Sequence, residues 1–72
     1  MAVRDEWFVL VGWPVSLRAA SEELGRFRKL PTAVRNARQH LHERHEIDFV
    51  SIYAVEGKAR PNVRDEPIAR VR

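Results

Sequence analysis

The side chains best suited to chemistry are concentrated in the stretch HLHERHEID, residues 40–48. His42 and His45 stand one helical turn apart, and Glu46 or Asp48 could add an oxygen ligand, as in a zinc site. A second interpretation needs no ligand, because histidines in the last turn of a helix interact favourably with the negative end of its dipole. Neighbouring arginines would also repel a cation. We therefore expect neither a metal nor another cofactor here.

Residues for nucleophilic catalysis are not assembled in any recognisable pattern. Ser16, Ser21 and Ser51 fall where a helix cap, a helix and a strand already account for a serine. The chain has three glycines and no glycine-rich loop that could cradle a phosphate. Cysteine is absent, which excludes disulfides and thiolate metal sites and is typical of a reducing, cytoplasmic setting. The sequence thus indicates a cytoplasmic protein that is not an enzyme.

The basic residues are numerous and strongly biased in type. Of 13 basic residues, all but Lys29 and Lys58 are arginine, and the formal net charge is +3. Guanidinium groups pair with phosphate or carboxylate through two parallel hydrogen bonds, so an arginine-rich surface suits the recognition of anions. A solvated charged surface without a partner is the alternative interpretation.

Two groups of cations could follow a phosphate backbone. Arg35, Arg38, His42 and His45 recur at helical spacing and would form one stripe along a helix. A second group lies in the glycine-led, polar segment 57–66, which has the composition of an exposed loop. The residues predicted to contact nucleic acid are Arg26, Arg28, Lys29, Arg35, Arg38, His42, Lys58, Arg60 and Arg64.

The elements that must position these side chains begin with the stretch EWFVLVGWP, residues 6–14. Its alternate positions are apolar on both sides, which predicts a strand that needs cover on both faces. A helix is predicted next, from the cap residue Ser16 to a break near residues 28–31. Its apolar stripe would consist of Leu17, Ala20, Leu24 and Phe27.

A second helix is predicted from Pro31, which suits the first helical position, to about residue 45. The stretch 46–57 then reads as a strand that is again apolar on both sides, and residues 67–72 can form a short final strand. The first two strands can pair in parallel through a right-handed crossover, while the third strand would run antiparallel to the second. The prediction is one α+β domain over residues 1–72, with two helices and a small three-stranded mixed sheet in the order β-α-α-β-β.

Two helices on one face of such a sheet would leave its other face uncovered. Exposed apolar patches of this kind usually mark a binding surface, and a second copy of the chain is the economical cover. The residues expected at this homodimer interface are Phe8, Leu10, Val50, Ile52 and Ala54. The alternatives are one helix on each face, or a fold-back of the loop 60–67 over the open face.

Two family resemblances rest on the order of these elements. The segment 8–41, with a strand ending in WP and a helix containing AVRNARQHL, looks somewhat like ribbon-helix-helix repressors, which insert paired strands into the DNA major groove. Its strand departs from that family because its residues are apolar where bases would be read. The order β-α-α-β-β with the basic turn GRFR, residues 25–28, resembles part of a KH RNA-binding domain, but GRFR lacks the second glycine of the GXXG loop. Both resemblances imply a nucleic-acid partner.

The leading hypothesis is a small regulatory or accessory protein that binds nucleic acid through its arginine-rich surface as a homodimer. The alternative is an inhibitor or adaptor that grips a partner protein with an apolar sheet face or a strand edge. No membrane association is expected, because the apolar run 7–13 is too short to span a bilayer.

Overall fold

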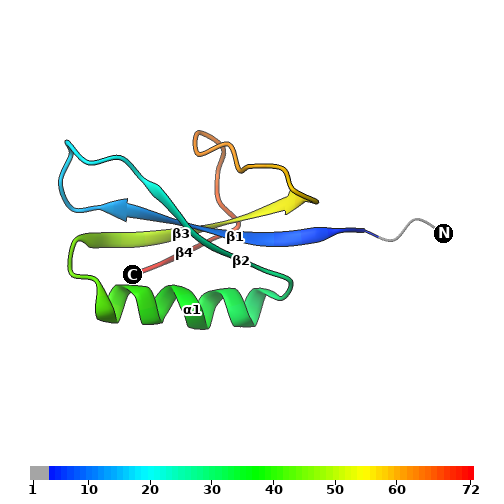
Figure 1. Ribbon diagram of the computed structural model, residues 1–72, viewed down its shortest axis with the longest axis horizontal. Helices are drawn as coiled ribbons and strands as arrows, with labels where there is room; N and C mark the ends of the chain where they lie inside the picture. The colour runs from blue at the N-terminus through cyan, green and yellow to red at the C-terminus, as the bar shows by residue number, and fades with distance from the viewer. Residues whose placement is uncertain (1–3) are drawn as a thin grey trace.

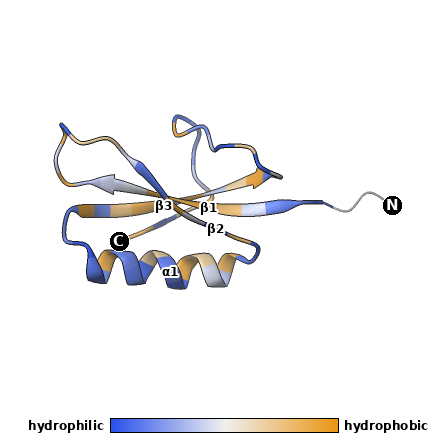
Figure 2. Ribbon diagram, viewed as in Figure 1, coloured by the Kyte–Doolittle hydropathy of each residue, from blue (hydrophilic) through white to orange (hydrophobic). Residues whose placement is uncertain are grey.

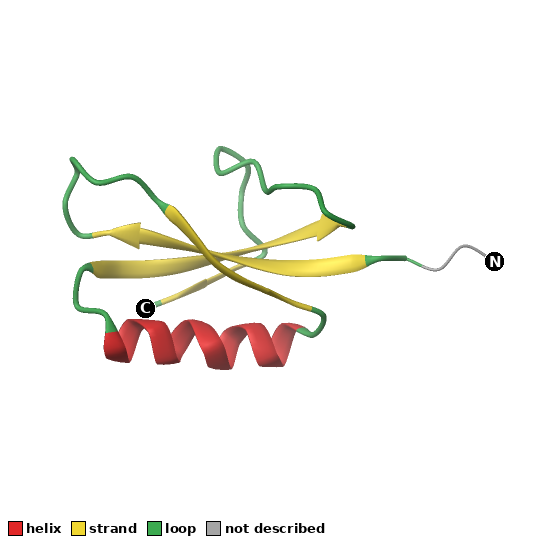
Figure 3. Cartoon of the chain, in the orientation of Figure 1, coloured by secondary structure: helices red, strands yellow, loops and turns green. Residues whose placement is uncertain are grey.

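The computed structural model describes residues 4–72 as a four-stranded antiparallel sheet with one helix on one face (Figure 1). The chain order is β1 (Glu6–Pro14), β2 (Glu22–Phe27), α1 (Leu30–Glu43), β3 (Ile47–Glu56) and β4 (Ala69–Val71) (Figure 3). The strands lie in the sheet in the order β2-β1-β3-β4. The α+β class is confirmed. The expected β-α-α-β-β order, with two helices and a three-stranded mixed sheet, is wrong for the described residues.

The first predicted helix is replaced by a loop and by strand β2. The pairing of β1 with β2 changes register between Leu10 and Val11, where a β-bulge leaves Leu24 as an extra residue in β2. Because of the bulge, Leu24 and Phe27 both pack against the core although they stand three residues apart. This spacing imitates one turn of a helix. Leu17, which began the supposed apolar stripe, is fully exposed in the β1–β2 loop.

The strand that follows α1 pairs antiparallel with β1, not parallel as expected. The reason is the β1–β2 hairpin, which reverses the chain before α1 begins. After the helix the chain therefore enters the centre of the sheet in the direction opposite to β1. β4 pairs antiparallel with β3 along three residue pairs, and this antiparallel pairing of the last two strands was predicted.

Helix α1 forms close to where the second helix was predicted, with Pro31 in its first turn. Ala33 and Ala37 are fully buried, and their small side chains let the helix approach the sheet closely. Figure 2 shows hydrophilic and apolar residues alternating along α1 and apolar residues in β1 and β3. Within residues 4–72, no helix combines the length and apolar character needed to cross a membrane.

The side chains expected at an open interface lie mostly in the core beneath α1. Leu10, Val50 and Ile52 are fully buried, and Phe8 is half-buried against the same cluster. Ala54 is exposed. The expectation that this face is bare is therefore corrected, because the hairpin and the register of β1 turn it toward the helix.

The opposite face of the sheet is covered in part by the segment 57–68, which connects β3 to β4. The hydroxyl of Tyr53 donates a hydrogen bond to the carbonyl oxygen of Val63 at 3.2 Å. The guanidinium of Arg26 donates hydrogen bonds to the carbonyl oxygens of Gly57, at 3.2 Å, and Ala59. Cover by a folded-back loop was one of the alternatives left open by the sequence. Val9 and Val11 in the middle of this face are buried, whereas Trp7 and Trp13 toward its ends are half-buried.

An ion-pair cluster fixes the end of α1 to the sheet. Arg44, which directly follows the helix, contacts the carboxylate of Glu46 at 2.6 Å and that of Glu22 in β2. The hydrogen bond from Arg44 is the main cause that lowers the pKa of Glu46 below its ordinary value of 4.5. The same bond, followed by that to Glu22, raises the pKa of Arg44.

A pH dependence of stability follows from the lowered pKa of Glu46. Its contribution to stability is fully present above the ordinary carboxyl pKa of 4.5 and is lost as the pH falls through the lower folded-state value. We expect the urea midpoint to decrease between about pH 6 and pH 3, and Glu46→Gln to reduce this decrease. Arg44→Gln should reduce it as well. An unchanged pH profile in both variants would contradict this assignment.

Candidate nucleic-acid interface

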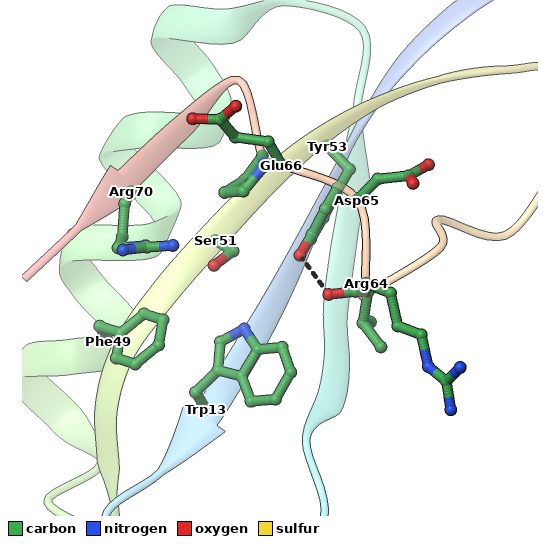
Figure 4. A pocket seen from close by; sticks show the side chains of 10 residues that line it. Trp13, Phe49, Ser51, Tyr53, Arg64, Asp65, Glu66 and Arg70 are labelled. Atoms are coloured by element: carbon green, nitrogen blue, oxygen red, sulfur yellow. Dashed lines mark hydrogen bonds between the residues drawn. The ribbon is translucent and has the colours of Figure 1, made fainter.

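An open pocket of about 400 Å³ lies on the sheet face opposite α1, between the strands and the connecting loop (Figure 4). Its loop side is residues 63–67. Its strand side consists of Trp13, Phe49, Ser51, Tyr53 and Arg70. We call this site the aromatic pocket. It brings together residues from β1, β3, β4 and the loop, which are far apart in the sequence.

The aromatic wall of the pocket is a cross-strand pair. Trp13 of β1 and Phe49 of β3 are register partners, so their side chains emerge side by side from the same sheet face. Their ring centroids are 6.0 Å apart and the ring planes differ by 17°, which makes a stacked pair. Both residues are half-buried, so the pair remains partly open to a ligand.

Two arginines border this wall. The guanidinium carbons of Arg70 and Arg72 lie 5.3 Å and 5.4 Å from the centroid of the Phe49 ring, within the range of a cation–π interaction. The ion pairs found among residues 4–72 involve other arginines, so neither of these two is neutralised by a carboxylate. They present positive charge beside a partly exposed aromatic surface.

In the part of the chain that the structure describes, the acidic residues of the loop form no ion pair with either arginine. Asp65 and Glu66 line the pocket through the loop, but Figure 4 shows both carboxylates directed away from Trp13 and Ser51. The guanidinium of Arg64 also points outward. The interior is therefore aromatic, with Ser51, 1% exposed, as its buried polar residue.

A second aromatic residue with an arginine lies at the other end of the same sheet face. The guanidinium carbon of Arg28 is 4.7 Å from the centroid of the Trp7 ring. Asp5 forms an ion pair with Arg28 and accepts a hydrogen bond from the indole nitrogen of Trp7 at 3.0 Å. Trp7 and Trp13 are six residues apart on β1, so the two aromatic sites are separated by about 20 Å.

The two groups of cations predicted from the sequence lie on opposite layers of the molecule. Arg35, Arg38 and His42 are exposed on α1, beneath the sheet. Lys58, Arg60 and Arg64 are exposed in the loop between β3 and β4. Figure 1 shows this loop on the other side of the sheet from α1. A single backbone would have to pass around the domain to reach both. The fold does not bring them together into one surface.

The three remaining predicted cations precede α1 and have different environments. Arg26 is half-buried, binds loop carbonyls and lies 3.3 Å from a carboxylate oxygen of Glu23. Arg28 is exposed but already paired with Asp5. Lys29 is exposed at the start of the helix. Arg26 is thus part of the structure that fixes the loop.

The fold does not bring the histidines of the predicted metal site close together. His42 and His45 are exposed, and His40 is half-buried. Residues 4–72 contain no group of three or more His, Cys, Asp or Glu side chains arranged to hold a metal ion.

Sequence reasoning missed the residues of the aromatic pocket, although a signal for them was present. Trp13 shares one strand face with Trp7, and Phe49 shares one with Tyr53, because each pair is separated by an even number of positions. This face was expected to lie under the helices. Arg70 and Arg72 were left out because their neighbours in space are distant in sequence.

No family model, curated protein or solved structure matches this chain. The functional inference rests on the arrangement of the chain's own residues.

Proposed function

We propose that this protein binds single-stranded nucleic acid on the sheet face opposite α1. The observation that carries the proposal is the stacked pair of Trp13 and Phe49, bordered by the unpaired guanidinium groups of Arg70 and Arg72. A base would stack on the aromatic pair, and the neighbouring phosphates would contact the two arginines. The protein would act as a regulatory or accessory binding protein and not as an enzyme.

The energetic basis of the proposal is the combination of stacking with charge. Stacking of a base on an aromatic side chain contributes about 1–3 kcal/mol and tolerates any base, because every base has a π face. Arginine adds two-pronged hydrogen bonds to phosphate. Neither contribution alone would select a nucleic acid over other anions or apolar ligands. Their close placement at one end of one sheet face favours a ligand that has both chemistries.

A single strand fits this surface better than a duplex. In a duplex the faces of the bases are already stacked on one another, so an aromatic side chain reaches them only after the strand is opened. The indole and phenyl rings here present surface rather than the polar atoms that read base edges in a groove. We therefore expect single strands to bind more tightly than duplexes of the same length.

The competing adaptor hypothesis relied on an open apolar sheet face. That face is covered by α1, so a partner protein would have to pair with one of the sheet edges formed by β2 and β4. β4 is three residues long and carries Arg70, and β2 contains a bulge; both features discourage pairing with another strand. These features favour the nucleic-acid proposal over the adaptor.

The proposal is tested with a fluorescently labelled strand of about 12 nucleotides, whose anisotropy reports binding over a range of salt concentrations. Each phosphate contact on a single strand contributes about −0.7 to the slope of log affinity against log salt concentration. We expect Arg70→Gln with Arg72→Gln to weaken binding and to flatten the slope by about 1.4.

The matched control is Arg35→Gln with Arg38→Gln, which removes the same charge from the exposed side of α1. This pair should retain the wild-type slope. Equal losses in both pairs would show that only net charge attracts the strand, and the sheet-face proposal would be wrong. Absence of binding to single-stranded DNA and RNA at about 50 mM salt would also contradict it.

A further inference from the structure

The aromatic pocket contains a hydrogen-bond donor without an acceptor. The indole nitrogen of Trp13 is enclosed and has no hydrogen-bond partner among the described residues. In Figure 4 the nitrogen side of the indole is turned toward Ser51 and Tyr53, that is, into the pocket. A buried donor without a partner costs about 1–3 kcal/mol. A ligand that brings an acceptor to this position would remove that cost.

The second tryptophan of the same sheet face shows the contrast. The indole nitrogen of Trp7 donates to the carboxylate of Asp5 at 3.0 Å, so its hydrogen bond is made within the chain. Trp13 has no comparable neighbour. The hydroxyl of Tyr53 on β3 donates to the carbonyl of Val63 and does not accept a hydrogen bond from this indole. Of the two tryptophans, only the one in the pocket therefore has an unpartnered donor.

The volume of the pocket limits the size of the ligand that could supply a hydrogen-bond acceptor to Trp13. A volume of about 400 Å³ is near the lower end of the range for small-molecule sites and has room for one nucleoside. The loop side is fastened to the sheet near the pocket by the bond from Tyr53 to Val63. Because the nitrogen is enclosed, the side chains around it must shift as the acceptor arrives.

Building on the proposed function, we propose that the aromatic pocket takes one base of the bound strand and selects bases that carry a carbonyl group. The carbonyl oxygen accepts the hydrogen bond from the indole nitrogen of Trp13. Guanine, cytosine, thymine and uracil have such an oxygen. Adenine has an amino group, a donor, where guanine has its oxygen, and accepts hydrogen bonds only through its ring nitrogens. Stacking alone makes no such distinction between purines of equal size, so the preference separates a base-reading pocket from a simple stacking surface.

The sharpest probes are single strands of about eight nucleotides made only of deoxyinosine or only of deoxyadenosine. Hypoxanthine and adenine are purines of the same size, and hypoxanthine has a carbonyl where adenine has an amino group. We expect the wild-type protein to bind the deoxyinosine strand more tightly, by up to about tenfold. The ratio of the two dissociation constants, measured by the anisotropy of fluorescently labelled strands, is the readout.

Two variants locate the origin of this ratio. Trp13→Phe retains an aromatic ring but lacks the indole nitrogen, so the ratio should fall close to one. Trp7→Phe is the matched control, because it removes an indole whose hydrogen bond is already made to Asp5. The ratio should persist in this control. Thermal melting of both variants verifies that the fold is retained.

The possible results have distinct meanings. A wild-type ratio near one, or a ratio that persists in Trp13→Phe, would overturn the carbonyl-reading pocket while leaving single-strand binding in place. Failure of the wild-type protein to bind either strand would overturn the proposed function together with this inference. A ratio that disappears only in Trp13→Phe supports both.

Discussion

Replacing both Trp13 and Phe49 with alanine is expected to weaken single-strand binding by about 1–3 kcal/mol, or about five- to 150-fold. The substitutions remove the stacked pair on which a base would lie, and they leave Arg70 and Arg72 in place. Affinity should fall at every salt concentration while the salt slope stays close to that of the wild type. This pattern is the reverse of that expected for the arginine substitutions. Fluorescence anisotropy measures both quantities.

A control for this prediction is Leu17→Ala in the β1–β2 loop. Leu17 is a large, fully exposed apolar residue that lies outside the aromatic pocket. Its removal should leave the affinity unchanged, and the circular dichroism of both proteins should match the wild type. A double variant that binds as tightly as the wild type would remove the stacked pair from the proposed interface.

The largest effect on stability is expected from Ile52→Glu. Ile52 is fully buried beneath α1, and the new carboxylate would have no partner there. A domain of this size has a free energy of unfolding of about 4–11 kcal/mol, and burial of an unpaired charge can remove more than about 4 kcal/mol. We therefore expect a chain that is largely unfolded or melts far below the wild type in a urea titration.

The same substitution at Ile68 provides a matched control. Ile68 is 51% exposed just before β4, so Ile68→Glu should cost little stability. The sequence alone predicted that Ile52 lies at a homodimer interface, in which case Ile52→Glu would yield a folded monomer. Sedimentation distinguishes that result from unfolding. The homodimer itself stays a prediction, now without the open apolar face that motivated it.

The sequence by itself determined the elements whose signals are local. The strand over residues 6–14, the helix that begins near Pro31 and the strand over 47–56 were all predicted close to their observed positions. Each depends on a period of apolar residues or on the fixed backbone of proline, which act over a few neighbouring positions. The alternate faces of β1 were also read correctly, because side-chain direction in a strand has a period of two. In β3 this period fails at Ile47, which lies in the core with Val50 because the register shifts opposite Trp13 and Pro14.

Strand β2 shows where local reasoning fails. Leu24 and Phe27 have helical spacing, but a bulge opposite Leu10 and Val11 produces the same coincidence in a strand. The bulge depends on how β2 pairs with β1. No pattern within residues 22–27 records that pairing. Because β2 was missed, the direction of β3 relative to β1 was also predicted wrongly, and so was the mixed sheet.

Only the tertiary structure decided which face of the sheet the helix covers, and this choice determined the candidate site. Both faces of β1 are apolar, so the sequence permits Leu10 or Val9 to lie beneath α1. The hairpin places Leu10 there, and Arg26 and Tyr53 hold the loop against the other face. The pocket formed by Trp13, Phe49 and Arg70 arises from these long-range contacts. Its residues are close in space but distant along the chain. Their grouping therefore depends on strand register and sheet topology, and no single stretch of sequence encodes it.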